Sequence, residues 1–151
     1  HKGVLPRDLA STLQVALVGG GLAVFGQVGD GAVIYDTGTE LILTHWPAQE
    51  AVNLTDFLTS APLTETLSIT LAHGPINRLV MMTDGLTHLL LDFRMRRPHL
   101  PALERLLGVC RSAPDPASLN DDLRRFLNSG PVNERSDDDK TLVLAVREVA
   151  T

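Results

Sequence analysis

The chain has 151 residues, of which 44% are hydrophobic and 21% charged, a composition typical of one globular domain and unlike that of disordered or collagen-like proteins. With 13 basic and 18 acidic residues its formal charge is −5, so we expect neither nucleic acid nor a membrane surface as a partner. The single cysteine, Cys110, excludes an internal disulfide, and no apolar run approaches the roughly 18 residues that a membrane-spanning helix needs. We therefore expect one cytoplasmic domain over residues 1–151.

The first residues, HKGVLP, include no initiator methionine and do not have the profile of a signal peptide. We expect a chain that is processed or truncated at its N-terminus.

Short aliphatic and β-branched runs predict strands in the first half of the chain: residues 12–18, 22–28, 32–35, 40–44, 67–72 and 78–82. Turns rich in glycine and aspartate separate the first four runs, which favours an antiparallel meander over βαβ units. The long segment 45–66, which holds Trp46, is predicted to be a surface loop.

The second half has helical periodicity. A short helix is predicted from Leu86 to Phe93, and a second helix begins with Pro101 and places Cys110 on its apolar face. A third helix runs from Ser118 as the N-cap to Gly130 as the C-terminal stop, and residues 141–146 predict a strand buried on both faces. The fold class that follows is α+β, with two packed antiparallel sheets and helices on the outer faces.

Several kinds of active site are disfavoured. The five histidines include no His-x-x-x-His pair, and one cysteine cannot build a zinc site. Neither a Gly-x-Ser-x-Gly elbow nor a phosphate-binding Gly-x-x-x-x-Gly-Lys loop is present.

Acidic residues at strand ends are the strongest chemical signal. Asp30 lies in VGDGA, Asp84 lies in MMTDGL, and the run 137–139 precedes the last strand. Each site alone is explained by the ordinary preference of aspartate for turns. Together they form a set of hard oxygen ligands that suits Mg²⁺ or Mn²⁺, because adjacent aspartates repel one another unless they are solvated or neutralised by a cation.

The order VGDGAVI, MMTDGLTHLLLD, NERSDDDKTLVLAV resembles the bacterial branch of the type 2C, metal-dependent serine/threonine protein phosphatases over nearly the whole chain. In that family a strand ends in Ser/Thr-Asp-Gly, and after two helices an Asp-Asp/Asn-x-Thr motif opens the last strand. Thr83-Asp84-Gly85 and Asp138-Asp139-Lys140-Thr141 stand in those places. The resemblance implies an αββα sandwich of two antiparallel sheets flanked by helices, here without its N-terminal part.

The resemblance further implies that Asp84 and Asp138 are ligands of a catalytic Mn²⁺ or Mg²⁺. Asp30 matches the aspartate of the family's Gly-Asp-Ser motif, which helps to hold a further ion, although Gly31 replaces the serine. The implied reaction is hydrolysis of phosphoserine or phosphothreonine in proteins by a metal-activated water, without a protein nucleophile. The family's N-terminal metal-bridging aspartate and phosphate-gripping basic residue are not found, so we expect the chain alone to be incomplete and inactive.

Two other hypotheses remain open. One is a catalytically inactive phosphatase-like module that binds a phosphoprotein or kinase partner, and the other is an unrelated α+β protein whose aspartates only form turns. The basic cluster Arg94, Arg96 and Arg97 is either a solvated loop or a contact for a phosphoprotein or another anionic partner. For the phosphatase we expect a phosphoprotein substrate, a role in signal transduction, a partner kinase as a further candidate, and self-association of the incomplete sandwich.

Overall fold

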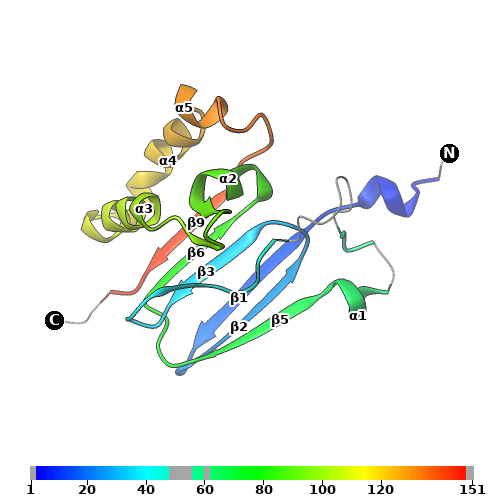
Figure 1. Ribbon diagram of the computed structural model, residues 1–151, viewed down its shortest axis with the longest axis horizontal. Coiled ribbons are helices and arrows are strands. Elements are labelled where there is room, and N and C mark those ends of the chain that lie inside the picture. The colour runs from blue at the N-terminus through cyan, green and yellow to red at the C-terminus, as the bar shows by residue number, and fades with distance from the viewer. Residues whose placement is uncertain (1–2, 48–55, 60–61, 149–151) are drawn as a thin grey trace.

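The structure, a computed structural model, describes residues 3–47, 56–59 and 62–148 (Figure 1). Its strands are β1 (Leu13–Gly19), β2 (Leu22–Val28), β3 (Ala32–Asp36), β4 (Leu41–Leu43), β5 (Ser68–His73), β6 (Arg78–Met82), β7 (Leu91–Asp92), β8 (Arg97–Pro98) and β9 (Leu142–Val146). Its helices are η1 (Pro6–Leu9), α1 (Leu63–Thr66), η2 (Asp84–Leu86), α2 (Thr87–Leu90), α3 (Leu100–Ser112), η3 (Pro116–Leu119), α4 (Asn120–Leu127) and α5 (Gly130–Asn133). Much of the loop predicted over 45–66 lies outside the described residues, and the described part includes α1.

The strands form two main antiparallel sheets, of order β1-β2-β5 and β4-β3-β6-β9, with a small β7-β8 hairpin beside them. The predicted α+β class with two antiparallel sheets is therefore confirmed. The predicted meander is wrong at one turn, because β2 pairs with β5 and β3 pairs with β6. Residues 29–31 thus carry the chain from one sheet to the other instead of closing a hairpin.

An apolar layer joins the two sheets. Phe25 of β2 stacks on Tyr35 of β3, with ring centroids 4.9 Å apart, and both side chains are buried. Ala23, Val33 and Ala72 complete the middle of this layer.

A second apolar layer lies between the four-stranded sheet and its helices, which Figure 1 shows on one side of that sheet. Leu86 of η2 and Leu90 of α2 are fully buried there. Leu103 and Leu107 of α3 are buried as well. Cys110, which the helical pattern places on the same apolar face, is only half-buried.

Several predicted element ends differ from the structure. The helix expected to reach Phe93 ends at Leu90, because the next residues pair with β8. Ser118 is not an N-cap, since the side chain of Asp115 caps η3 in its place. Gly130 does not stop a helix; it begins α5.

Strand β9 is at the edge of its sheet and is buried on one face only. Val143 has 48% of its surface exposed, so the predicted burial on both faces is wrong. A purely apolar run is compatible with an edge strand when one face is left uncovered.

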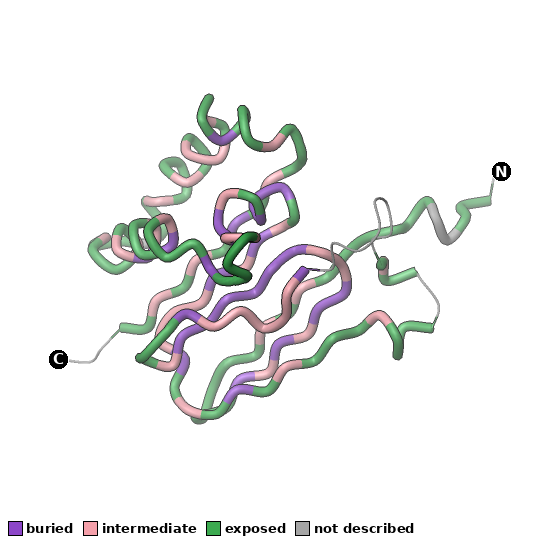
Figure 2. The backbone as a smooth tube through the Cα atoms, viewed as in Figure 1, coloured by how far each residue is buried: buried purple, intermediate pink, exposed green. Residues whose placement is uncertain are grey.

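The outer face of the three-stranded sheet is apolar and exposed. Figure 2 shows most of β1 and β5 in the colour of exposed residues. Leu17, Val24 and Leu71 are neighbours across β1, β2 and β5, and Leu17 and Leu71 are 65% and 61% exposed. None of the helices in the described part of the chain is long and apolar enough to cross a bilayer.

Candidate metal centre

Three loops meet at one end of the four-stranded sheet because of its antiparallel register. Met82, the last residue of β6, pairs with Ala32, the first residue of β3. On its other side Met82 pairs with Leu142, the first residue of β9. The segments before β3, after β6 and before β9 are therefore adjacent, although they are far apart in the sequence.

These loops carry the predicted metal ligands Asp30, Asp84 and Asp138, which the structure brings into electrostatic contact. Partial burial raises the pKa of the Asp84 carboxyl, and the charges of Asp30 and Asp138 raise it further. The N–H of Gly85 donates to Asp84 Oδ1 at 2.9 Å and opposes this rise. The mutual repulsion means that a cation bound among these carboxylates would relieve an electrostatic cost.

Thr83 joins the loop after β6 to the loop before β9. Its hydroxyl donates to the backbone oxygen of Asp139 at 3.2 Å and accepts from the N–H of Thr141 at 2.9 Å. The N–H of Thr83 also donates to the oxygen of Thr141 at 3.2 Å. One threonine side chain thus fixes the relative position of the segments that carry Asp84 and Asp138.

Gly85 allows the same two segments to approach closely. A Cβ at this position would lie 2.5 Å from the backbone oxygen of Asp139 and 3.3 Å from Cβ of Asp138. Any side chain at Gly85 would therefore push the acidic loop away from Asp84.

The acidic loop is held by its own backbone and by Lys140. The Lys140 ammonium group donates to the carbonyl oxygens of Ser136 and Asp138, at 3.1 and 2.9 Å. The N–H of Asp139 donates to Asp138 Oδ1 at 2.8 Å. Asp137 is exposed.

The loop before β3 explains why Gly31 stands where the resembling family has serine. A Cβ on Gly31 would lie 2.4 Å from Nε2 of Gln14 and 2.5 Å from the backbone oxygen of Met82. Gln14 Nε2 donates to that Met82 oxygen at 3.0 Å, and Gln27 Nε2 donates to the Gly31 oxygen at 2.7 Å. Two glutamine amides from the other sheet thus occupy the space around Gly31.

The described residues contain no ready-made group of three His, Cys, Asp or Glu side chains close enough to hold a metal ion. The three predicted ligands therefore share one electrostatic neighbourhood without converging on one point. Their role as metal ligands stays a prediction.

Comparison with known proteins supplies the family. Residues 1–128 match the family described as Protein phosphatase 2C. The chain belongs to the protein phosphatase 2C family. The resemblance inferred from the sequence motifs is thereby confirmed.

This phosphatase 2C chain is also similar to an Escherichia coli protein named serine/threonine-protein phosphatase 3. The two are 33% identical over 148 residues, which is 96% of this chain and 58% of the relative. The chain therefore spans a little over half of the length of that relative.

Solved structures show the same fold at low sequence identity. A variant of a bacterial serine phosphatase superposes with a TM-score of 0.59 at 19% identity, over 91% of this chain and 53% of that one. PppA of Pseudomonas aeruginosa gives 0.57 at 19% identity, over 89% and 56%. The phosphatase domain of SpoIIE from Bacillus subtilis gives 0.52 at 18% identity, over 93% and 60%.

Two positioning residues of this phosphatase 2C chain were missed by sequence reasoning. In the sequence Thr83 is recognisable only as part of the Thr-Asp-Gly motif, although its place directly before Asp84 is a usable signal. Nothing in the sequence indicated that Gln14, a polar residue in an apolar strand, reaches the turn at Gly31. That contact joins two sheets, and only the tertiary structure contains it.

Proposed function

We propose that the protein is a metal-dependent serine/threonine phosphatase that acts on phosphoproteins in the cytoplasm. One observation carries the proposal: the sheet register places the segments that hold Asp30, Asp84 and Asp138 side by side at one end of the four-stranded sheet. Membership of the phosphatase 2C family and the name of the Escherichia coli relative support the reaction type.

The donor set is compatible with Mn²⁺ or Mg²⁺. Carboxylate oxygens are the ligands that these ions prefer, and a divalent cation would neutralise the negative charge that three adjacent segments bring together here. We assign Asp84 and Asp138 to the catalytic ion and Asp30 to a further ion. Since the chain covers 58% of its relative, the remaining ligands belong, in this proposal, to sequence that this chain does not contain.

When bound, such an ion lowers the pKa of a water molecule and offsets the charge of a phosphate group. The contribution of this chain is to hold the ligands. Thr83 ties the loops of Asp84 and Asp138 together, and Gly85 lets them approach. Lys140 fixes the acidic loop through the carbonyl oxygens of Ser136 and Asp138.

Titration calorimetry with MnCl₂ on this chain tests the assignment directly. Asp84→Asn and Asp138→Asn should each weaken Mn²⁺ binding by about tenfold or more, because each removes an anionic oxygen ligand. Asp137→Asn is the matched control: it removes the same charge from the same loop and should leave the affinity within about twofold of the original. Equal losses of Mn²⁺ affinity in Asp137→Asn and Asp138→Asn would show that the ion is attracted by diffuse negative charge and is not bound at a defined site.

Hydrolysis of p-nitrophenyl phosphate tests the reaction, and it needs the chain joined to the segment that the relative has in addition. Turnover that depends on Mn²⁺ and is lost in Asp138→Asn supports the phosphatase. A folded, Mn²⁺-binding protein that does not turn over would instead be the inactive, phosphoprotein-binding module.

A further inference from the structure

A cluster of aromatic rings lies beside the candidate metal centre. The N–H of Thr44 donates to the oxygen of Val33 at 3.0 Å, which continues the β3–β4 pairing toward the end of the sheet where Asp30 lies. Trp46 follows two residues later. His88 is in the first turn of α2, directly after the 3₁₀ turn that begins at Asp84.

The rings of this cluster are held in contact by Phe93. Its centroid lies 5.2 Å from that of Trp46 in an edge-on arrangement, and 4.6 Å from that of His88 in a stacked one. Both contacts have the offset or edge geometry that aromatic pairs prefer. Phe93 thereby fixes the start of the β7–β8 turn against the chain that follows β4.

The same turn presents a row of arginines. Arg94, Arg96 and Arg97 are all exposed, and Cζ of Arg96 lies 5.5 Å from the centre of the Trp46 ring. Arg96 has a φ of 49°, a left-handed conformation that is uncommon for a residue other than glycine or asparagine. The side chain of Asp92 accepts from the N–H of Met95 at 3.0 Å and closes the turn.

The charge of this turn is not balanced by the described part of the chain. Asp92 is the cross-strand partner of Arg97, but no ion pair within 4.0 Å involves any of the three arginines among the described residues. A guanidinium can stack on an aromatic face and still donate at its edge to a carboxylate. A local excess of positive charge in a chain of formal charge −5 therefore favours an anionic partner.

We propose that Trp46, Phe93, Arg94, Arg96 and Arg97 form a docking surface for an acidic segment of the phosphoprotein substrate. The proposal rests on the proposed function, because it names a class of substrate for the same site. A peptide that crosses this surface would present acidic side chains to the arginines and lead toward the carboxylate end of the sheet. A nucleic acid is the less suitable occupant, because its continuous phosphate backbone would approach the carboxylates as well as the arginines.

The test is a binding measurement on this chain without metal and without hydrolysis. Trp46 is the only tryptophan of the sequence, so its fluorescence reports directly on the surface. The probes are a glutamate-rich peptide without phosphate and a glutamine-rich peptide of the same length. We expect the glutamate-rich peptide to bind with an affinity that falls as NaCl is raised, and the glutamine-rich peptide to bind at least about tenfold more weakly.

Two matched double variants locate the binding. Arg94→Gln with Arg96→Gln should weaken the glutamate-rich peptide about tenfold, whereas Arg124→Gln with Arg125→Gln, the same charge change on exposed residues of α4, should leave the affinity within about twofold. Arg94→Gln alone tests whether the loss comes from a disturbed Trp46, because, in the described part of the chain, only Arg96 lies over the Trp46 ring. This single variant should account for about half of the loss in binding free energy.

Equal binding of the two peptides, or equal losses in the two double variants, would overturn the proposal. So would tighter binding of a short oligoribonucleotide, which would assign the surface to nucleic acid. Because the peptides carry no phosphate and no metal is added, these outcomes do not depend on whether the protein is a phosphatase. If the protein does not hydrolyse phosphate but binds the glutamate-rich peptide through Arg94 and Arg96, the docking surface is supported and the proposed function is refuted.

Discussion

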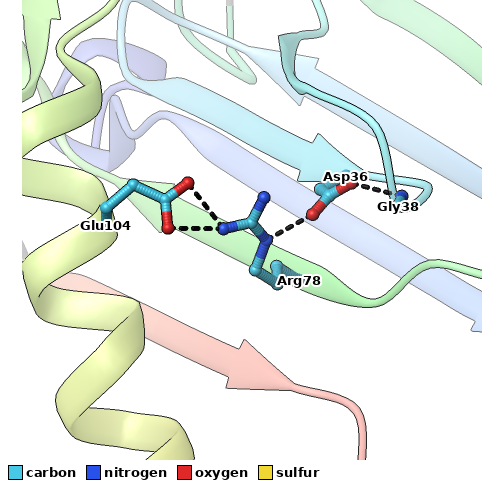
Figure 3. A network of polar contacts seen from close by, with 4 residues as sticks. All are labelled: Asp36, Gly38, Arg78 and Glu104. Carbon is cyan, nitrogen blue, oxygen red and sulfur yellow. Dashed lines mark hydrogen bonds and ion pairs between the residues drawn. The ribbon is translucent and has the colours of Figure 1, made fainter.

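Arg78→Met removes the guanidinium that joins two carboxylates at the end of the four-stranded sheet opposite the candidate metal centre (Figure 3). One partner, Asp36, is its register partner on β3; the Asp36 side chain is 3% exposed and also accepts from the N–H of Gly38. The other partner, Glu104 of α3, is 50% exposed and accepts from Arg78 Nη1 at 2.7 and 2.8 Å. Methionine preserves the aliphatic packing of the arginine stem and removes only the charge and the hydrogen bonds.

The magnitude follows from the burial of Asp36. Without Arg78, this carboxylate keeps one donor, the N–H of Gly38, in a position almost without solvent. Leaving such a charge unpaired costs about 3–5 kcal/mol, a third or more of the 5–15 kcal/mol by which small domains are typically stable. Glu104→Gln, by contrast, should cost less than about 1 kcal/mol, because water solvates the exposed partner.

Urea unfolding followed by Trp46 fluorescence measures these differences. The double variant Asp36→Asn with Arg78→Met should cost about 2 kcal/mol less than the sum of the single variants, because it leaves no unpaired buried charge. A loss below about 1 kcal/mol for Arg78→Met, or strict additivity in the cycle, would refute this account of the ion pair.

Three further predictions concern other parts of the chain. Gly85→Ala should cost about 1–3 kcal/mol of unfolding free energy and weaken Mn²⁺ binding, because the added methyl would lie 2.5 Å from a backbone oxygen of the acidic loop. The control is Gly108→Ala in α3, which should stabilise the chain because nothing lies within 4 Å of the added methyl. Equal effects of the two substitutions would contradict the steric argument. Leu17→Lys with Leu71→Glu should reduce self-association of the chain in analytical ultracentrifugation, since both side chains lie on the uncovered face of the three-stranded sheet; an original chain that sediments as a monomer would remove the basis of this prediction. Burial lowers the pKa of the His45 imidazole below its ordinary value of 6.5. As the pH falls through 6.5, the imidazole therefore binds a proton more readily in the unfolded state than in the folded state, and the free energy of unfolding decreases. Between pH 7.5 and 5, the original chain should therefore lose more unfolding free energy than His45→Gln, and parallel losses would show that His45 contributes nothing.

The sequence predicted the candidate metal ligands because the motifs around them are local. Apolar runs that end in Asp-Gly place Asp30 and Asp84 just outside a core, and the acidic run places Asp138 directly before the last strand. What the motifs do not reveal is that the hydroxyl of Thr83 and the amide of Gln14 hold those loops in place through contacts between distant segments. Side-chain identity is readable from one segment, whereas a hydrogen bond between two segments is not.

By itself the sequence determined the strands of the two main sheets, the helix α3 and the phosphatase 2C motifs, because backbone preference and apolar periodicity act over a few residues. Only the tertiary structure decided that the chain changes sheets at residues 29–31, since pairing of β2 with β5 and of β3 with β6 joins strands about 40 residues apart. It also ended a helix at Leu90, where pairing with Arg97 and Pro98 outweighs the local helical pattern. That pairing builds the arginine-bearing turn, so the proposed docking surface depends on a choice between helix and hairpin that local sequence alone does not make.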